Sequence, residues 1–175
     1  MRRALLVFFS AATCFAQLQG VVDIHTHGAP DNRPRRLDVI EWARSAKAAG
    51  MRAIVLKNHF APTAQAAYLV RQIVPGIEVY AGFSLDRPVG GINVAAVEQA
   101  NIFTGNTLRI VWMPTFDSEN NVKYAKSKEQ YVSVSKNGRL LPEVIEVLKY
   151  LSKNNLVLAT GHSTAEEDLL LVKEA

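Results

Sequence analysis

Short apolar runs alternate along the chain with longer segments in which apolar residues recur every three to four positions. The apolar runs cover residues 20–27, 51–59, 77–85, 108–116 and 156–163. The segments that follow them, residues 36–50, 63–76, 90–106, 142–155 and 165–175, have the periodicity of amphipathic helices. This strand-then-helix order predicts an α/β fold in which helices cover a parallel sheet.

Residue types at the segment ends support these boundaries. Pro142 is the first residue of the fourth predicted helix, a position at which proline is favoured. Ser163 and Thr164 are each followed three residues later by a glutamate, which is the pattern of a capping box. Residues 117–141 break the alternation with a polar, irregular insertion, and the Asn137-Gly138 pair within it predicts a β-hairpin.

Five strand–helix units are fewer than the eight of a closed (β/α)8 barrel, which needs about 250 residues. The 175-residue chain therefore predicts either an open sheet or about the first five units of a barrel of the TIM type. We favour the second, with a sequence truncated at its C-terminus, because the apolar helix at residues 165–175 otherwise covers nothing. The apolar sheet edge left exposed in this way favours aggregation or a homo-oligomer.

The first residues have the composition of a secretory signal peptide. Two arginines precede an apolar stretch over residues 4–15, and Cys14 and Ala16 supply the small residues before a cleavage site. Residues 1–17 are therefore expected to be a leader, and residues 18–175 the N-terminal part of a barrel domain that is secreted or periplasmic and not membrane-bound after cleavage. Cys14 is the only cysteine in the sequence, so the mature chain has no disulfide and no cysteine metal site.

The charge of the chain favours no nucleic-acid partner, and the partner that we expect is a small-molecule substrate. The formal net charge is +4, and two of these units come from the leader. So small a balance points to no polyanionic partner. Arg33, Arg35 and Arg36 cluster in the sequence, and we expect this cluster to be a solvated loop.

All four histidines lie at the ends of predicted strands. Side chains alternate along a strand, so Asp23, His25 and His27 share one face of the first strand. His59 ends the second strand and His162 ends the fifth. The carboxyl ends of parallel strands meet at the edge where sites form in such folds, so we expect the four imidazoles to be metal ligands. Zn²⁺ suits this donor set best, and Mn²⁺, Fe²⁺ and Ni²⁺ also suit it.

Lys57 shares its face of the second strand with His59, so it is expected to point into the same site. Burying an unpaired ammonium costs several kcal/mol. Two interpretations follow: an ion pair with Asp23, or carboxylation by CO₂ to an anionic carbamate that could bridge two cations.

A metal ion of this kind activates water for hydrolysis, which also needs a general base. Asp86, Asp117 and Glu119 are the acids nearest the active edge in the sequence. Acidic residues in loops are more often solvated charges than catalytic bases, and we expect all three to be solvated.

At this point several blocks of the sequence resemble one known family. Asp-Ile-His-Thr-His at residues 23–27, the units that follow, and Ala-Thr-Gly-His-Ser at residues 159–163 resemble the amidohydrolase superfamily of metal-dependent hydrolases. Residues 51–59, 89–100, 110–115, 140–148 and 156–162 are similar to one largely uncharacterised branch of it. The resemblance covers essentially the whole chain after the leader.

The resemblance implies a (β/α)8 barrel with one or two divalent metal ions. It implies that His25 and His27 are the first-strand ligand pair and that His162 is the fifth-strand ligand. The family's fourth-strand carboxylated lysine or glutamate has no counterpart in residues 109–115. Lys57 and His59 are expected to substitute, as second-strand histidines do in the polymerase and histidinol phosphatase (PHP) group. The family's sixth-strand histidine and eighth-strand aspartate, a metal ligand and proton shuttle, would lie beyond Ala175.

The sequence therefore predicts a metal-dependent hydrolase that cleaves a C–N or C–O bond of a small amide, cyclic amide or ester through a metal-activated water. His25, His27, His59 and His162 are the expected metal ligands, Lys57 takes part in catalysis, and Asp23 orients a ligand. A PHP-like phosphoesterase with the same site is one alternative. A non-catalytic fragment that binds metal is the other.

Overall fold

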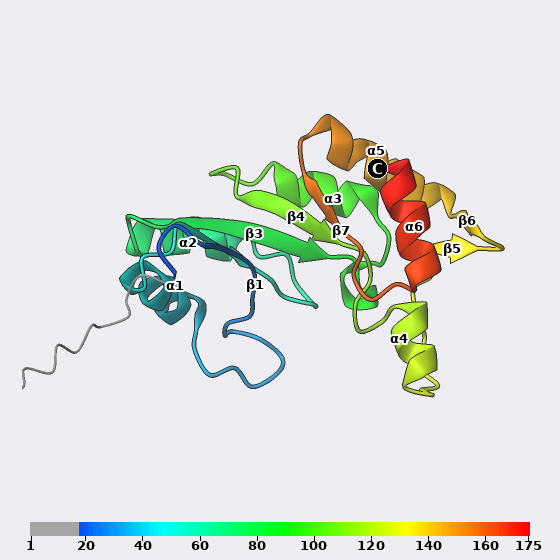
Figure 1. Cartoon of the computed structure of the whole chain (residues 1–175), viewed down its shortest axis with the longest axis horizontal. Helices are drawn as coiled ribbons and strands as arrows, with labels where there is room; N and C mark the ends of the chain where they lie inside the picture. The colour runs from blue at the N-terminus through cyan, green and yellow to red at the C-terminus, as the bar shows by residue number, and fades with distance from the viewer. Residues whose placement is uncertain (1–17) are drawn as a thin grey trace, which may run out of the picture.

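Five parallel strands form one curled sheet in the computed structural model, which describes residues 18–175. The strands lie side by side in the order β1-β2-β3-β4-β7. Their bounds are Val22–Thr26, Ala53–Leu56, Glu78–Ser84, Leu108–Trp112 and Val157–Ala159. The sheet forms a half-barrel that is consistent with part of a TIM barrel (Figure 1). The predicted α/β fold with five barrel units is confirmed, whereas the predicted signal peptide lies outside the described residues.

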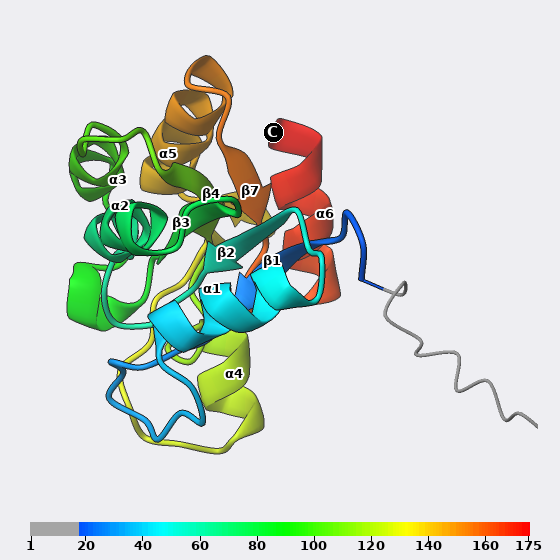
Figure 2. The same cartoon turned by 90° about the vertical axis from the view of Figure 1, so that its left-hand side faces the viewer.

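A helix follows each strand after its connecting loop. These are α1 (Val39–Ala48), α2 (Ala64–Ile73), α3 (Val94–Asn101), α5 (Pro142–Lys153) and α6 (Ala165–Glu174). Figure 2 shows α1, α2, α3 and α5 on one side of the sheet, with α6 apart from them. Within residues 18–175, no helix combines the length and hydrophobicity needed to cross a membrane.

Alternation along the strands separates two apolar clusters. Ile54 and Leu56 of β2 face the helices and join the main core, with Val79, Ala81 and Phe83 of β3. Val55, Ile110 and Trp112 form a second, smaller cluster from the residues in between. Both faces of the sheet are therefore apolar along the middle of the strands, which leaves the strand ends for polar chemistry.

The polar insertion contains more structure than the sequence predicts. The hairpin is confirmed as β5 (Ser135–Lys136) and β6 (Arg139–Leu140), with positive φ angles of 53° at Asn137 and 72° at Gly138. Helix α4 (Glu119–Tyr124) was not predicted. Val122 is its one buried residue, and a helical periodicity cannot be recognised in the sequence from a single apolar position.

The capping box before α6 is confirmed. Thr164 accepts a hydrogen bond from the Glu167 backbone nitrogen, and the Glu167 carboxylate accepts one from the Thr164 backbone nitrogen. A short 3₁₀ helix, η1 (Arg87–Val89), follows β3.

Candidate metal centre

The ends of three strands bring five side chains together, namely His25, His27, Lys57, His59 and His162, which we call the histidine cluster. Register places the end of β1 beside the end of β2, because the Lys57 backbone nitrogen donates to the Thr26 carbonyl at 2.8 Å. The ring centroids of His25 and His27 are 5.1 Å apart, those of His27 and His59 4.8 Å, and those of His59 and His162 6.5 Å. All the predicted site residues except Asp23 therefore lie in one cluster of side chains.

Lys57 and two imidazoles form the most closely spaced part of the cluster. The Nε2 atoms of His25 and His27 are 3.2 Å apart, and Nζ of Lys57 is also 3.2 Å from Nε2 of His25. The Lys57 side chain also lies over the ring of Trp112, at 4.8 Å from the centroid. Lys57 is only 3% exposed, and burial lowers its pKa to about 8.

Of the two interpretations of Lys57, the ion pair with Asp23 is wrong. Within residues 18–175, no carboxylate oxygen lies within 4 Å of Nζ. Asp23 instead accepts a hydrogen bond from the His25 backbone nitrogen at 2.9 Å. Asp23 therefore fixes the main chain of β1 at His25 and leaves the lysine without a counter-ion.

His59 is held by a hydrogen-bonded chain that ends on a buried carboxylate. The two oxygens of Asp86 accept from Thr115, Oδ1 from its backbone nitrogen at 2.7 Å and Oδ2 from its hydroxyl at 2.6 Å. The Thr115 hydroxyl uses its one O–H to donate to Asp86, so at 2.6 Å it accepts a hydrogen bond from Nδ1–H of His59. This network assigns the proton of His59 to Nδ1 and leaves Nε2 with a free lone pair.

Asp86 is fully buried, so its expected role as a solvated loop charge is wrong. Burial raises its pKa, against the effect of its hydrogen bonds from Thr115. Burial also lowers the pKa of His59 to about 3, with a further contribution from the positive charge of Lys57. The sequence carried one signal for Asp86, which is its position just after the third strand at the edge where the histidines also end.

Gly161 sets the position of His162. Its φ of +72° is in the left-handed region, and a Cβ atom there would lie 2.3 Å from the Met113 carbonyl oxygen. This close approach lets the His162 backbone nitrogen donate to the Pro114 carbonyl at 3.0 Å. On its other side, the His162 carbonyl accepts from the Ser118 hydroxyl at 3.0 Å.

The loop between β1 and α1 brings two arginines to the cluster. The expectation of a solvated loop is wrong for Arg35, which is partly buried, whereas Arg33 is exposed. The Arg33 guanidinium carbon lies 4.0 Å from the ring centroid of Phe116, and that ring lies 4.3 Å from His59. Nε of Arg35 pairs with Asp31 at 2.6 Å, and its Nη2 lies 3.4 Å from Nδ1 of His27. Burial, followed by the charge of Arg35, lowers the pKa of His27 to about 4.

The remaining acids near this edge have structural partners. Asp117 is largely buried and accepts from the Arg87 backbone nitrogen at 2.9 Å, so it is not the solvated charge that was expected. Glu119 pairs with Lys123 and accepts from the Ser133 hydroxyl at 2.6 Å.

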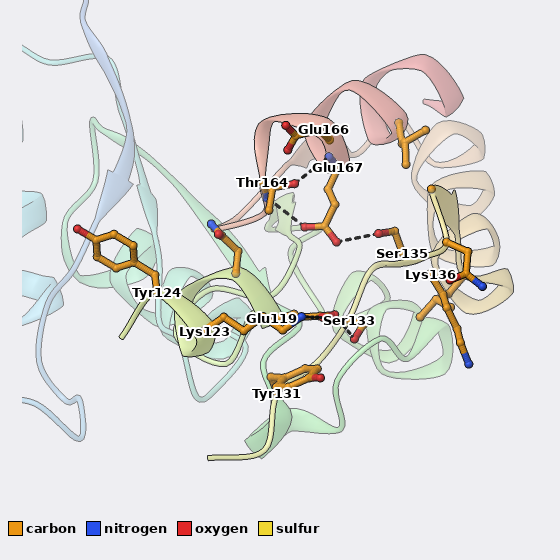
Figure 3. Close-up of a pocket in the computed structure, with 15 residues that line it drawn as sticks. Glu119, Lys123, Tyr124, Tyr131, Ser133, Ser135, Lys136, Thr164, Glu166 and Glu167 are labelled. Atoms are coloured by element: carbon orange, nitrogen blue, oxygen red, sulfur yellow. Dashed lines mark hydrogen bonds and ion pairs between the residues drawn. The ribbon is translucent and has the colours of Figure 1, made fainter. Parts of the chain in front are cut away.

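A cavity of about 930 Å³ is lined by Glu119 and by none of the histidines. It lies between α4, the hairpin and α6 (Figure 3). Two of its three acidic side chains are paired, Glu119 with Lys123 and Glu167 with Ser135, and Glu166 is the third. The cavity is therefore separate from the histidine cluster.

The donor set of the cluster fits a divalent cation, although no three His, Cys, Asp or Glu side chains of residues 18–175 are already placed to hold one. Two nitrogens bound to one tetrahedral Zn²⁺ at ~2.0 Å to ~2.1 Å lie roughly 3.3 Å apart. The two Nε2 atoms of His25 and His27 are 3.2 Å apart. Partial or full burial, together with the positive charge of Lys57, lowers the pKa of all four imidazoles, which favours the neutral form whose lone pair a cation needs.

The contact between Arg35 and His27 must change before His27 can bind a cation through Nε2. A guanidinium only donates, so Nδ1 of His27 is an acceptor beside Arg35 and the ring proton is on Nε2. A cation held by Nε2 requires the other tautomer, with the proton on Nδ1. Arg35 keeps its pair with Asp31 in either case.

Comparison with known proteins adds a family and no function. No curated protein and no solved structure matches the chain. One family model, described as a family of unknown function (DUF6282), matches residues 20–175, which include all four histidines and every strand and helix of the described part of the chain. The chain therefore belongs to DUF6282, a family of unknown function.

Proposed function

We propose that this protein is a metal-dependent hydrolase whose histidine cluster holds one or two divalent cations, Zn²⁺ being the best suited. The observation that carries the proposal is the 3.2 Å spacing of the His25 and His27 Nε2 atoms at the ends of parallel strands. His59 and His162 are the proposed further ligands, since the ring centroid of His59 lies 4.8 Å from that of His27 and 6.5 Å from that of His162. The resemblance to the amidohydrolase superfamily supports the same site.

When bound, such a cation activates a water molecule and polarises the oxygen of the bond to be cleaved. The chain's own residues prepare this site. The Asp86–Thr115 pair holds His59 with its Nε2 lone pair free. Asp23 and Gly161 fix the main chain at His25 and His162. The substrate proposed is a small amide, cyclic amide or ester.

Among the described residues, Lys57 is the proposed catalytic side chain. With a pKa of about 8, its amine is partly neutral near physiological pH. A neutral amine has a lone pair at Nζ that accepts a proton from water or combines with CO₂ to form a carbamate. The two roles differ in mass, because the carbamate adds one CO₂ to the intact protein.

A phosphoesterase is the second candidate, and one observation favours it. Arg33 and Arg35 both lie beside the cluster, where guanidinium groups bind phosphate oxygens.

Hydrolysis assays test the proposal. The protein as purified, after chelation and after reloading with Zn²⁺ or Mn²⁺ is assayed on p-nitrophenyl esters, p-nitroanilides and p-nitrophenyl phosphate. We expect hydrolysis that chelation abolishes and reloading restores, and that Lys57→Met abolishes while the exposed-residue control Lys149→Met does not. A preference for the phosphate would favour the second candidate. Metal bound without hydrolysis of any substrate class would support a non-catalytic protein instead.

A further inference from the structure

The loop of residues 28–38 is a structured part of the site. At the start of the loop, the Ala29 backbone pairs with the main chain at its end, donating to Leu37 at 2.9 Å and accepting from Val39 at 2.9 Å. Inside the loop, the Asp31 side chain is fully buried against Arg35. The two arginines are therefore held in place.

Arg33 differs from Arg35 in having its hydrogen-bond donors free. Its guanidinium lies 4.0 Å from the centroid of the Phe116 ring, which fixes its position by cation–π contact. The side chain is exposed, and no hydrogen bond or ion pair joins it to another residue of the described chain, 18–175. A guanidinium held by its flat face still presents its N–H edge to a ligand.

Phe116 connects this guanidinium to the histidine cluster. The Phe116 ring lies 4.3 Å from the ring of His59 and 5.7 Å, edge on, from the ring of His162. Arg33 thus stands one aromatic ring away from two of the proposed metal ligands. That separation suits a substrate with an anionic group beside the bond to be cleaved.

The charges around the cluster also favour an anion. Within residues 18–175, no carboxylate lies within 4 Å of the Arg33 guanidinium or of Nζ of Lys57, whereas Asp31 offsets the charge of Arg35. Asp86 is buried beneath Thr115.

We propose that Arg33 binds an anionic group of the substrate, a carboxylate or a phosphate, next to the reacting bond. This inference rests on the proposed function for the reaction, whereas the binding of the anion can be measured by itself. The substrate is then an anionic ester, amide or phosphoester rather than a neutral one. Arg33 forms a charge-assisted, two-pronged hydrogen-bonded pair with its oxygens.

Anion titration of the purified, metal-containing protein tests the proposal. Succinate and inorganic phosphate are titrated by calorimetry, with neutral succinamide as the probe control. Arg33→Met is expected to weaken binding of the preferred anion by about ten- to hundredfold, the loss of one charge-assisted pair. Arg36→Met, an exposed arginine of the same loop, is expected to leave binding within about twofold because it removes only a screened surface charge. Tighter succinate binding assigns a carboxylate, and tighter phosphate binding assigns a phosphate.

Two results would overturn the anion site: no anion binding by the wild-type protein, or equal weakening by Arg33→Met and Arg36→Met. Arg33→Lys guards against a folding artefact, since it keeps the charge and is expected to bind more weakly than wild type but more tightly than Arg33→Met. Arg33-dependent binding in a protein without metal or hydrolysis would support the anion site and contradict the proposed function. Metal-dependent hydrolysis without any role for Arg33 would support the proposed function and contradict the anion site.

Discussion

Lys57 directly follows β2, His25 lies on the neighbouring parallel strand β1, and Nζ of the lysine is 3.2 Å from Nε2 of the imidazole. The ammonium is buried, its nearest aromatic neighbour is Trp112, and no carboxylate of residues 18–175 neutralises it within 4 Å. Such a group is costly to keep charged. Its position is therefore best explained by chemistry that uses its neutral form.

Replacing Lys57 shows whether the buried amine destabilises the folded protein and how its charge affects His25. Lys57→Met removes a positive charge that lowers the pKa of His25, so the His25 pKa is expected to rise, as measured by NMR titration of the metal-free protein. Unfolding in urea is expected to show unchanged or greater stability, because an apolar side chain replaces an unpaired buried amine. Lys149→Met is the control, and a clear loss of stability confined to Lys57→Met would show that the amine is a structural element.

Acid is expected to destabilise the metal-free protein. The folded pKa values of His27 and His59 are about 4 and about 3, below their ordinary value of 6.5. Below pH ~6.5 the unfolded chain therefore binds protons that the folded chain does not, and the free energy of unfolding falls as the pH is lowered towards 3. Asp86 acts in the opposite direction, since its raised pKa favours the folded state at low pH.

Urea unfolding from pH 7.5 to pH 4 in the presence of a chelator measures this. His59→Gln is expected to flatten the pH dependence. A free energy of unfolding that stays constant across the range would contradict the assignment of neutral, buried imidazoles.

Thr115 is expected to matter through its hydroxyl. Thr115→Val leaves Nδ1 of His59 and Oδ2 of Asp86 without their shared partner, at a cost of about 1–3 kcal/mol. Thr115→Ser keeps the hydroxyl and is expected to restore most of that stability. Denaturant unfolding compares the two, and ¹⁵N chemical shifts report whether His59 keeps its proton on Nδ1. Equal stability of the two variants would show that the hydrogen-bonded chain is unimportant.

Gly161 is expected to tolerate no side chain. A Cβ atom at Gly161 would lie 2.3 Å and 2.5 Å from two backbone oxygens, on Met113 and Pro114, at a φ of +72°. Gly161→Ala should cost roughly 2 kcal/mol or more and displace His162. Gly138→Ala is the matched control, with the same φ of +72° and nothing within 4 Å, and should cost only about 1 kcal/mol. Similar losses from both substitutions would show that the close approach adds no constraint.

Local patterns predicted the fold and the meeting of the histidines, whereas the supporting contacts depend on loops. Parallel strands end at one edge, so the positions of His25, His59 and His162 follow from strand assignment alone. The burial of Asp86 does not, because it depends on Thr115 from the loop after the next strand. The approach of Arg33 to Phe116 likewise joins two loops whose conformations no periodicity encodes.

Elemental analysis of the purified wild-type protein tests the central claim, that the histidine cluster binds a divalent cation. We expect about one metal ion per chain, or two if Lys57 is carboxylated. His25→Ala should abolish this binding, since it removes one of the two Nε2 atoms that are 3.2 Å apart. Wild-type protein that contains no metal, and takes up none when Zn²⁺ or Mn²⁺ is supplied, would contradict the claim.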